Sequence, residues 1–169
     1  MAETLHVDVT LADDNWSAAV SDIEEVCLTA ARAAYEAGRE AEKFEAEAGI
    51  LLTDDMQVRE LNKTYRDKDK PTNVLSFAAQ EGGAAFDHAK GMLGDIVIAY
   101  GVANREALQE NKSLENHLSH LVVHGMLHLL GHDHKEALEA EQMENLEIQT
   151  LAGLGVANPY NRAPEAGSP

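Results

Sequence analysis

The segment from His124 to His134 contains the side chains best suited to chemistry in this chain. His124 and His128 are four residues apart, and on a helix this spacing places both imidazoles on one face, with Cβ atoms about 5–6 Å apart. Gly131 stands where we expect the helix to end, because glycine tolerates the left-handed backbone beyond a helix terminus. A turn there would bring His134 back as a third ligand. Three histidines with one open coordination position are typical of a catalytic zinc site.

The same spacing invites comparison with the zinc proteases whose motif reads H-E-x-x-H-x-x-G-x-x-H. The histidines and the glycine of this chain fall in that register, but Gly125 stands at the position of the glutamate. In those proteases the glutamate is the general base that acts on the metal-bound water. The spacing therefore predicts a metal site, whereas the missing base argues against peptide cleavage.

Six of the eight histidines lie within eighteen residues, and packing alone does not explain such clustering. His120 continues the series of His124 and His128, but positions four residues apart drift around a straight helix and converge poorly on one ion. A post-turn His134 completes a better tripod, so we expect the ligands to be His124, His128 and His134. His120 is expected to support a ligand or to line the pocket.

The remaining residues of this cluster, His117, His132 and Asp133, are not expected to be the main metal ligands. His117 is expected to be an ordinary helix residue. His132 is either an alternative ligand or part of the pocket wall. Asp133 is either a turn residue or the acceptor to which a metal-bound histidine donates its other N–H, and the two interpretations are equally favoured.

Length and composition predict one domain with its own hydrophobic core, because the chain has 169 residues. No run of eighteen apolar residues is present, so no transmembrane helix is expected. The N-terminus lacks the basic and apolar regions of a secretory signal. The single cysteine, Cys27, excludes an internal disulfide and fits a reducing compartment. We therefore expect a cytoplasmic protein that does not bind membranes.

The net charge of −17 would repel nucleic acid at long range. Five of the thirteen basic residues nevertheless fall within one short stretch: Arg59, Lys63, Arg66, Lys68 and Lys70. This stretch could form a local basic surface on an otherwise acidic protein. It could also be a helix face of mixed charge, because the acidic residues Glu60, Asp67 and Asp69 lie within it. Composition alone does not predict a nucleic-acid-binding protein.

Hydrophobic periodicity predicts the elements that must position these residues. Alternating or continuously apolar segments predict strands over 5–11, 44–50, 73–78 and 93–100. Apolar residues at helical spacing predict helices over 16–37, 53–65, 102–110, 113–130 and 135–152. Thr53 and Ser113 are the expected N-caps of two of them. We expect one domain over residues 1–155 and a disordered C-terminal tail over 156–169.

Three stretches of the chain resemble the YbeY family of metal-dependent endoribonucleases. Residues 124–134 read HGMLHLLGHDH, against the family signature H-G-x-L-H-L-x-G-Y-D-H, with His132 where the family commonly has tyrosine. Residues 61–77 read LNKTYRDKDKPTNVLSF and resemble the family's L-N-x-x-[YF]-R-x-K-D-x-P-T-N-V-L-S-F. Residues 93–96, LGDI, fit a third block, and the resemblance runs from about residue 50 to residue 155.

The resemblance implies an α+β fold in which a mixed, roughly four-stranded sheet packs with about five helices. The metal site would lie at the end of a central helix, where His124, His128 and His134 would hold one Zn²⁺ ion. His124 and Arg66 would belong to the catalytic site, with Arg66 lining the cleft. Arginine suits this role because its planar guanidinium stays charged and presents a fork of donors to phosphate.

The resemblance also implies a function, that of a zinc-dependent, single-strand-specific endoribonuclease. Its processes would be rRNA maturation, including processing of the 16S 3′ end, and ribosome quality control. Partners would be single-stranded RNA or rRNA, with the ribosome or ribosomal proteins as candidates, and neither DNA nor a membrane. The metal would polarise a phosphate oxygen, activate water, or both. Arg66 would stabilise the developing charge, and Asn73 and Ser76 would orient the loop or contact substrate.

The sequence is also compatible with two other functions. The three-histidine spacing also suits a metallopeptidase-like hydrolase, although Gly125 weakens that interpretation. The chain could instead be a non-catalytic ribosome assembly factor whose metal is structural. Three imidazoles also suit nickel, copper or iron, so the sequence does not select zinc alone.

Overall fold

The computed structural model describes residues 5–39, 45–79, 91–133 and 136–160, which form one α+β domain. In chain order its elements are β1 (Leu5–Leu11), α1 (Asp14–Ala19), α2 (Ile23–Gly38), β2 (Ala46–Thr53), α3 (Asp55–Arg66), β3 (Val74–Ala78), β4 (Met92–Ala99), α4 (Tyr100–Gln109), α5 (Leu114–Leu129) and α6 (Ala137–Gly153). The predicted α+β class and the mixed four-stranded sheet are confirmed. The described residues form six helices, one more than expected.

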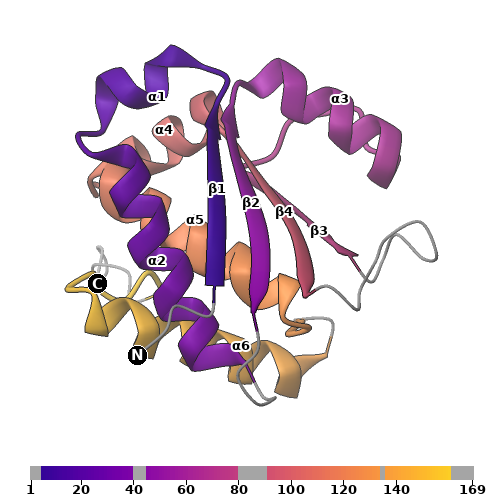
Figure 1. The fold of residues 1–169 in the computed structure, drawn as a ribbon. Coiled ribbons are helices and arrows are strands. Elements are labelled where there is room, and N and C mark those ends of the chain that lie inside the picture. Colours follow the sequence, from indigo (N-terminus) through magenta and orange to yellow (C-terminus); the bar gives the residue numbers. More distant parts are fainter. Residues whose placement is uncertain (1–4, 40–44, 80–90, 134–135, 161–169) are drawn as a thin grey trace.

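The sheet has the strand order β1-β2-β4-β3 (Figure 1). β1, β2 and β4 run parallel, and β3 pairs antiparallel with β4. Parallel neighbours cannot be joined by a tight turn, so α1 and α2 cross over between β1 and β2. In the centre of the sheet Ile50 of β2 pairs with Ile96 of β4, and both are buried. The continuous apolar run in β4 is explained by burial on both faces.

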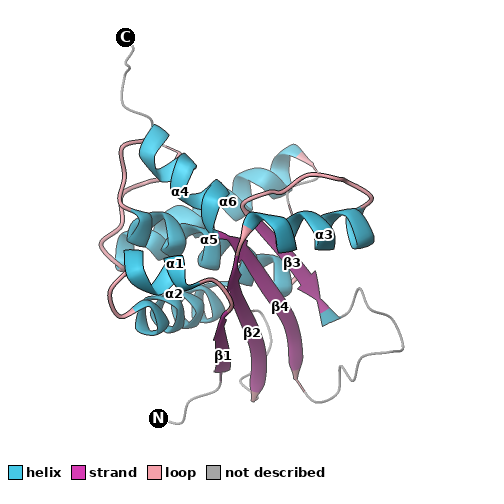
Figure 2. Cartoon of the chain, turned by 90° about the horizontal axis from the view of Figure 1, so that it is seen from above, coloured by secondary structure: helices cyan, strands magenta, loops and turns pink. Residues whose placement is uncertain are grey.

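Helices cover the two faces of the sheet (Figures 1 and 2). α2, α5 and α6 pack together on one face, where α5 buries Leu118, Val122 and Met126 completely. α3 packs on the other face, where Val58 and Val97 belong to a second, smaller core cluster. α5 is therefore the central helix of the main core, which explains why so few of its side chains are exposed.

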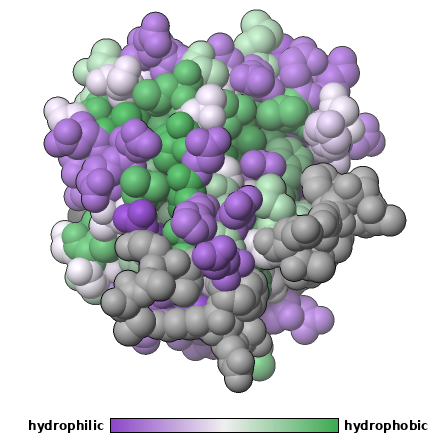
Figure 3. Space-filling model, viewed as in Figure 1, coloured by the Kyte–Doolittle hydropathy of each residue, from purple (hydrophilic) through white to green (hydrophobic). Residues whose placement is uncertain are grey.

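The edge strand β1 carries part of the exposed apolar surface. In the view of Figure 3, hydrophobic side chains gather in the upper centre, with hydrophilic side chains around them. Leu11, at the end of β1, is 42% exposed, whereas Leu5 at its start is buried.

Within the part of the chain that the structure describes, no helix has the length and apolar character needed to cross a membrane.

The helix predicted over 16–37 is divided into α1 and α2. Val20 adopts an extended backbone that places its side chain in the core, and Asp22 has a left-handed φ of 51°. Aspartate tolerates this conformation better than most residues that carry a side chain. Trp16 of α1 is fully buried, and its indole N–H donates to the Thr53 carbonyl at 3.1 Å. Periodicity did not reveal the break because apolar residues keep a helical spacing on both sides of it.

The second strand and the helix after it begin later than predicted. β2 covers Ala46–Thr53 instead of 44–50, and Phe44 lies outside the described residues. Thr53 pairs with Ala99 in the sheet, and Asp54 caps α3 by accepting a backbone hydrogen bond at 2.9 Å. The predicted cap at Thr53 is therefore wrong, because sheet pairing retains Thr53 and the next residue is an equally good cap.

The segment predicted as a tail is described only in part. Residues 156–160 fold back towards α6, where Val156 packs against the main core and the Tyr160 hydroxyl donates to Glu147. The rest of the predicted tail lies outside the described residues.

Candidate metal centre

Helix α5 carries the histidine cluster and has well-defined ends. Ser113 caps its first turn by accepting a backbone hydrogen bond at 3.0 Å, as predicted. At the other end Gly131 has a φ of +102°, and its N–H donates to the His128 carbonyl. The next N–H, that of His132, donates to the Leu127 carbonyl. This Schellman arrangement ends the helix just after His128, which confirms the predicted stop at Gly131.

His124 and His128 face each other across one turn of α5. Their Nε2 atoms lie 3.2 Å apart, and their rings are inclined at 82°. Two nitrogens that bind one tetrahedral zinc ion at 2.0–2.1 Å are about 3.3–3.4 Å apart. The separation in the structure therefore fits two ligands of one ion.

The third predicted ligand, His134, lies outside the described residues. Among the residues that are described, no group of three His, Cys, Asp or Glu side chains is placed to hold a metal ion. Asp133 lines the same cleft as His124 and His128. The described part of the site thus offers two convergent nitrogens, and the three-histidine set stays a prediction.

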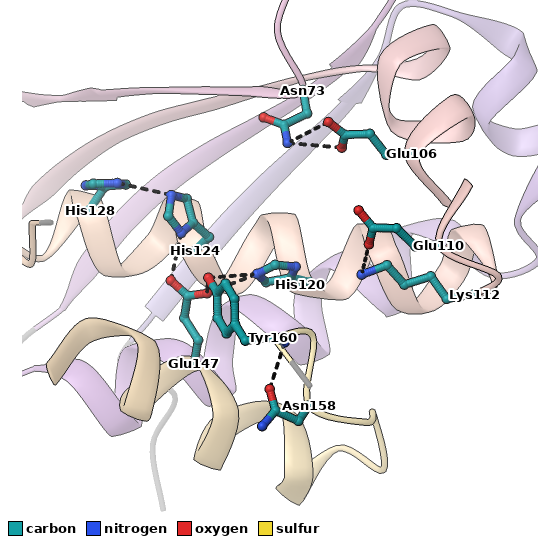
Figure 4. A network of polar contacts seen from close by, with 10 residues as sticks. All are labelled: Asn73, Glu106, Glu110, Lys112, His120, His124, His128, Glu147, Asn158 and Tyr160. Atoms are coloured by element: carbon teal, nitrogen blue, oxygen red, sulfur yellow. Dashed lines mark hydrogen bonds and ion pairs between the residues drawn. The ribbon is translucent and has the colours of Figure 1, made fainter. Parts of the chain in front are cut away.

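A buried carboxylate lies behind His124, on the side away from His128 (Figure 4). Glu147 of α6 is 1% exposed, and its Oε2 accepts a hydrogen bond from His124 Nδ1 at 2.7 Å. Its Oε1 accepts from His120 Nε2 at 2.9 Å and from the Tyr160 hydroxyl. Burial raises the pKa of Glu147, but the hydrogen bonds from His120 and His124 outweigh burial and lower this pKa to about 2.

The charge of Glu147 determines the tautomer of His124. An ionised carboxylate only accepts hydrogen bonds, so the His124 proton lies on Nδ1 and the lone pair lies on Nε2, the atom that faces His128. An acceptor behind the ring is the usual arrangement for metal-binding histidines, because it fixes the tautomer and raises the basicity of the ligand. The donor atoms and their orientation therefore fit a zinc ion.

Glu147 is not among the predicted site residues, although the sequence contains a signal for it. The buried residues of α6 recur at helical spacing, and they are Met143, Glu147, Thr150 and Leu151. A glutamate on a buried stripe needs a partner, because an unpaired buried carboxylate is costly. The partner could not be read from the sequence, because α5 and α6 meet only in the folded chain.

The other described histidines of α5 and the following turn have partners of their own. His120 Nε2 donates to Glu147, which holds the predicted ligand His124, so its support of that ligand is indirect. His117 is buried with its Nε2 2.8 Å from Glu106, and burial lowers the pKa of His117. The His132 Nε2 lies 2.8 Å from the Gly38 carbonyl, so this ring connects the turn after α5 to the end of α2.

A cleft of about 670 Å³ contains both the histidine pair and part of the basic stretch. Three of the five clustered cations, Arg66, Lys68 and Lys70, line it together with His124 and His128. The other lining residues are Asn62, Thr72, Asn73, Val74, Leu75, Ser76, Ala78 and Asp133. Of the two interpretations of the basic stretch, this placement supports a local basic surface.

Arg66 is the last residue of α3, and its guanidinium group has a defined position. Nη2 donates to the Ser76 carbonyl at 2.7 Å, and Cζ lies 4.9 Å from the centre of the Phe77 ring. Asp67 ends α3 with a left-handed φ of 61°. These contacts hold the positive charge of Arg66 at the wall of the cleft.

Asn73 anchors the loop that enters β3. Its Nδ2 donates to Glu106 Oε1 at 3.1 Å, and its Oδ1 accepts from the Val74 N–H at 2.6 Å. Glu106 in turn contacts His117, so this loop is connected to α4 and α5. Of the two roles expected for Asn73, these contacts favour orientation of the loop.

Gly125 lies where α5 comes closest to the sheet. A Cβ atom at this position would be 2.9 Å from Cγ2 of Ile96, closer than packed side chains allow. A side chain at residue 125 would therefore point at β4, and residue 125 does not line the cleft. This packing gives a structural reason for glycine at the position where zinc proteases carry their general base.

Comparisons with known proteins agree with one another. The sequence profile described as endoribonuclease YbeY matches residues 7–155. Endoribonuclease YbeY of Azorhizobium caulinodans is 48% identical over 92% of this chain and 96% of its own length. The corresponding protein of Rhodopseudomonas palustris strain BisA53 is 51% identical over 90% of this chain and 88% of its own length. The solution structure of TM1509 from Thermotoga maritima matches with a TM-score of 0.51 at 19% identity, over 93% of this chain and 100% of that one, which supports the fold alone.

Proposed function

This chain belongs to the endoribonuclease YbeY family, and on that basis we propose that it is a metal-dependent endoribonuclease that cleaves single-stranded RNA. The observation that carries the proposal is the cleft in which Arg66, Lys68 and Lys70 lie with His124 and His128. Lysine and arginine neutralise backbone phosphates, and a metal beside them would act on a phosphate that they hold.

The proposed metal is one Zn²⁺ ion held by His124, His128 and His134. Support comes from the 3.2 Å separation of the two Nε2 atoms and from Glu147 behind His124. When bound, zinc supplies Lewis-acid chemistry that polarises a phosphate oxygen and activates water. His124 contributes a lone pair on Nε2, because Glu147 keeps its proton on Nδ1.

Arg66 is proposed to bind the phosphate at the site of cleavage. Its hydrogen bond to the Ser76 carbonyl and its place over the Phe77 ring hold the guanidinium at the wall of the cleft that the histidine pair also lines. A cation placed in advance stabilises the charge that develops on the phosphate oxygens and needs no reorganisation during the reaction. A fork of donors also matches phosphate geometry, which a lysine at the same position would not do.

An exposed aromatic side chain next to Arg66 favours an unpaired substrate. Tyr65 is 62% exposed, and its ring packs edge-on against Phe77 at 5.5 Å between ring centres. A base can stack on an exposed ring only when it is free of its duplex partner. Tyr65 is therefore proposed to bind a nucleotide that flanks the one at the metal.

The proposed substrate in the cell is rRNA, with 16S 3′ end processing and ribosome quality control as the processes served in the cytoplasm. Support comes from the family resemblance of the two long motifs. The net charge of −17 limits non-specific binding of nucleic acid outside the cleft and suits basic ribosomal proteins as partners.

The experiment that tests this function compares three proteins purified in the same way: the zinc-loaded parent, His124→Ala and Arg66→Ala. Each is incubated with a single-stranded RNA and with a duplex of the same sequence. We expect the parent to cleave the single strand alone, and neither variant to cleave. Arg66→Ala should still bind zinc, whereas His124→Ala should not. Equal cleavage by all three proteins would reveal a contaminating nuclease and remove the support for catalysis.

The alternative functions predict other outcomes. A metallopeptidase would cleave casein in a manner that depends on His128, but the packing of Gly125 against Ile96 leaves no room for the usual base. A non-catalytic assembly factor would cleave no RNA, and its binding to ribosomes would survive removal of the metal.

A further inference from the structure

The chain after α6 returns to the metal centre and ends its described part at Tyr160. Gly155 has a φ of +80°, and the Val156 N–H donates to the Leu151 carbonyl, so α6 ends in a turn that reverses the chain. Asn158 Oδ1 then accepts the Tyr160 N–H at 2.8 Å. These two local contacts bring Tyr160 back to the helix that it has just left.

The Tyr160 hydroxyl reaches the same carboxylate that holds His124 (Figure 4). It donates to Glu147 Oε1 and lies 3.4 Å from His120 Nε2. The rings of Tyr160 and His120 pack edge-on, with 5.6 Å between their centres. Tyr160 is 40% exposed, so its contact with the protein is made by the hydroxyl end more than by burial of the whole ring.

The two carboxylate oxygens of Glu147 accept hydrogen bonds from different donors. Oε1 accepts from Tyr160 and His120, whereas among the described residues Oε2 accepts only from His124. A carboxylate with donors on one oxygen cannot rotate freely, and its second oxygen keeps a fixed direction. Burial and the charge of Glu147 raise the pKa of Tyr160, so its hydroxyl keeps its proton and stays a donor.

We propose that Tyr160 is a positioning residue of the metal centre, whose hydroxyl fixes Glu147 so that Oε2 holds His124 Nδ1 and directs His124 Nε2 to the metal. The inference rests on the proposed metal-dependent function. It adds a residue beyond position 155, where the match to the family profile ends. It also gives the segment after α6 a role in the site.

The experiment uses the full chain and removes only the hydroxyl, with Tyr160→Phe. The matched control is Tyr100→Phe, on α4, where the ring packs against Trp16. The zinc dissociation constant is measured by competition with a chromophoric chelator. Loss of one hydrogen bond should weaken zinc binding by Tyr160→Phe by about 3- to 10-fold. Loss of the carboxylate charge and of one of its two acceptor oxygens, in Glu147→Gln, should weaken it by about 10- to 100-fold.

A second measurement separates positioning from general stability. In the zinc-free protein, ¹⁵N NMR of the His124 ring reports how much of the Nδ1–H tautomer is present. We expect this fraction to fall in Tyr160→Phe and to stay at the parent level in Tyr100→Phe, while the unfolding midpoints of both remain close to that of the parent.

The outcomes distinguish this inference from the proposed function. Zinc affinity and tautomer fraction that are the same in Tyr160→Phe and in the parent would overturn the role of Tyr160 and leave the metal centre standing. A parent that binds no zinc would overturn the metal centre. The tautomer fractions of the zinc-free proteins would then still decide whether Tyr160 positions His124.

Discussion

The hydrogen bond between His124 Nδ1 and Glu147 Oε2, at 2.7 Å, joins α5 to α6 directly behind the candidate metal centre. Because Glu147 is buried and ionised, this bond fixes both the direction and the tautomer of the His124 ring. The ring of His124 is therefore oriented by a residue that does not line the cleft. Substitutions in α6 that move Glu147 should change the affinity of the site for its metal.

Protonation of Glu147 should lower the free energy of unfolding of the zinc-free protein in acid. The pKa of Glu147 is lowered from the ordinary 4.5 to about 2, so its contribution to stability is complete above pH 4.5 and is lost as the pH falls to about 2. At about 1.4 kcal/mol for each pKa unit, this contribution is about 3 kcal/mol. Urea unfolding from pH 6 down to about pH 2 measures most of it.

The matched comparison for this prediction is between Glu147→Gln and Glu141→Gln, since residue 141 is an exposed position of the same helix. As the pH falls, the free energy of unfolding should decrease steeply in the parent and in Glu141→Gln. It should decrease less steeply in Glu147→Gln. Parallel curves for all three proteins would contradict the buried charge.

Gly125→Ala should destabilise the protein even though alanine favours helices. The new Cβ would meet Cγ2 of Ile96 at 2.9 Å, and overpacking of this kind costs about 1–3 kcal/mol. Gly153→Ala, in α6, is the matched control, because no atom lies within 4 Å of the added Cβ. That variant should be neutral or gain up to about 1 kcal/mol. Urea denaturation compares the two, and equal free energies of unfolding would show that α5 does not pack on β4 as described.

Tyr65→Ala should weaken binding of single-stranded RNA by about 1–3 kcal/mol, the range for loss of one stacked base. Tyr65→Phe keeps the ring and should bind as the parent does. Leu108→Ala, which truncates a 70% exposed side chain on α4, serves as the control for loss of apolar surface. Fluorescence anisotropy of a labelled oligonucleotide at constant salt measures these affinities. Equal binding by Tyr65→Ala and Leu108→Ala would exclude stacking on Tyr65.

Lys68→Ala and Lys70→Ala should change how RNA binding responds to salt. Each cation that contacts a phosphate contributes about 0.7 to the slope of log affinity against log salt on a single strand, so each variant should lower the slope by that amount. Lys112→Ala should leave it unchanged, since Lys112 pairs with Glu110 at 2.8 Å and does not line the cleft. An unchanged slope in Lys68→Ala and Lys70→Ala would mean that the phosphates follow another path.

Local sequence patterns were enough to predict most of the fold. The Ser113 cap, the Gly131 stop and the alternation of residues 5–11 depend on residues within a few positions of one another. The break between α1 and α2 could not be predicted in this way. It depends on the fit of Val20 and Trp16 into a core made by distant segments, and the helical period of apolar residues continues across it.

The sequence by itself determined the residue types and spacings of the candidate site: the four-residue interval of His124 and His128, the glycine turn, and the basic stretch that contains Arg66. Only the tertiary structure decided which partners these residues meet. Glu147 is 23 positions from His124, and the Gly38 carbonyl is 94 positions from His132. Spacing along one helix follows from backbone geometry alone, whereas contacts between helices depend on how the whole core packs. For that reason Glu147 and Tyr160 became visible only in the folded chain.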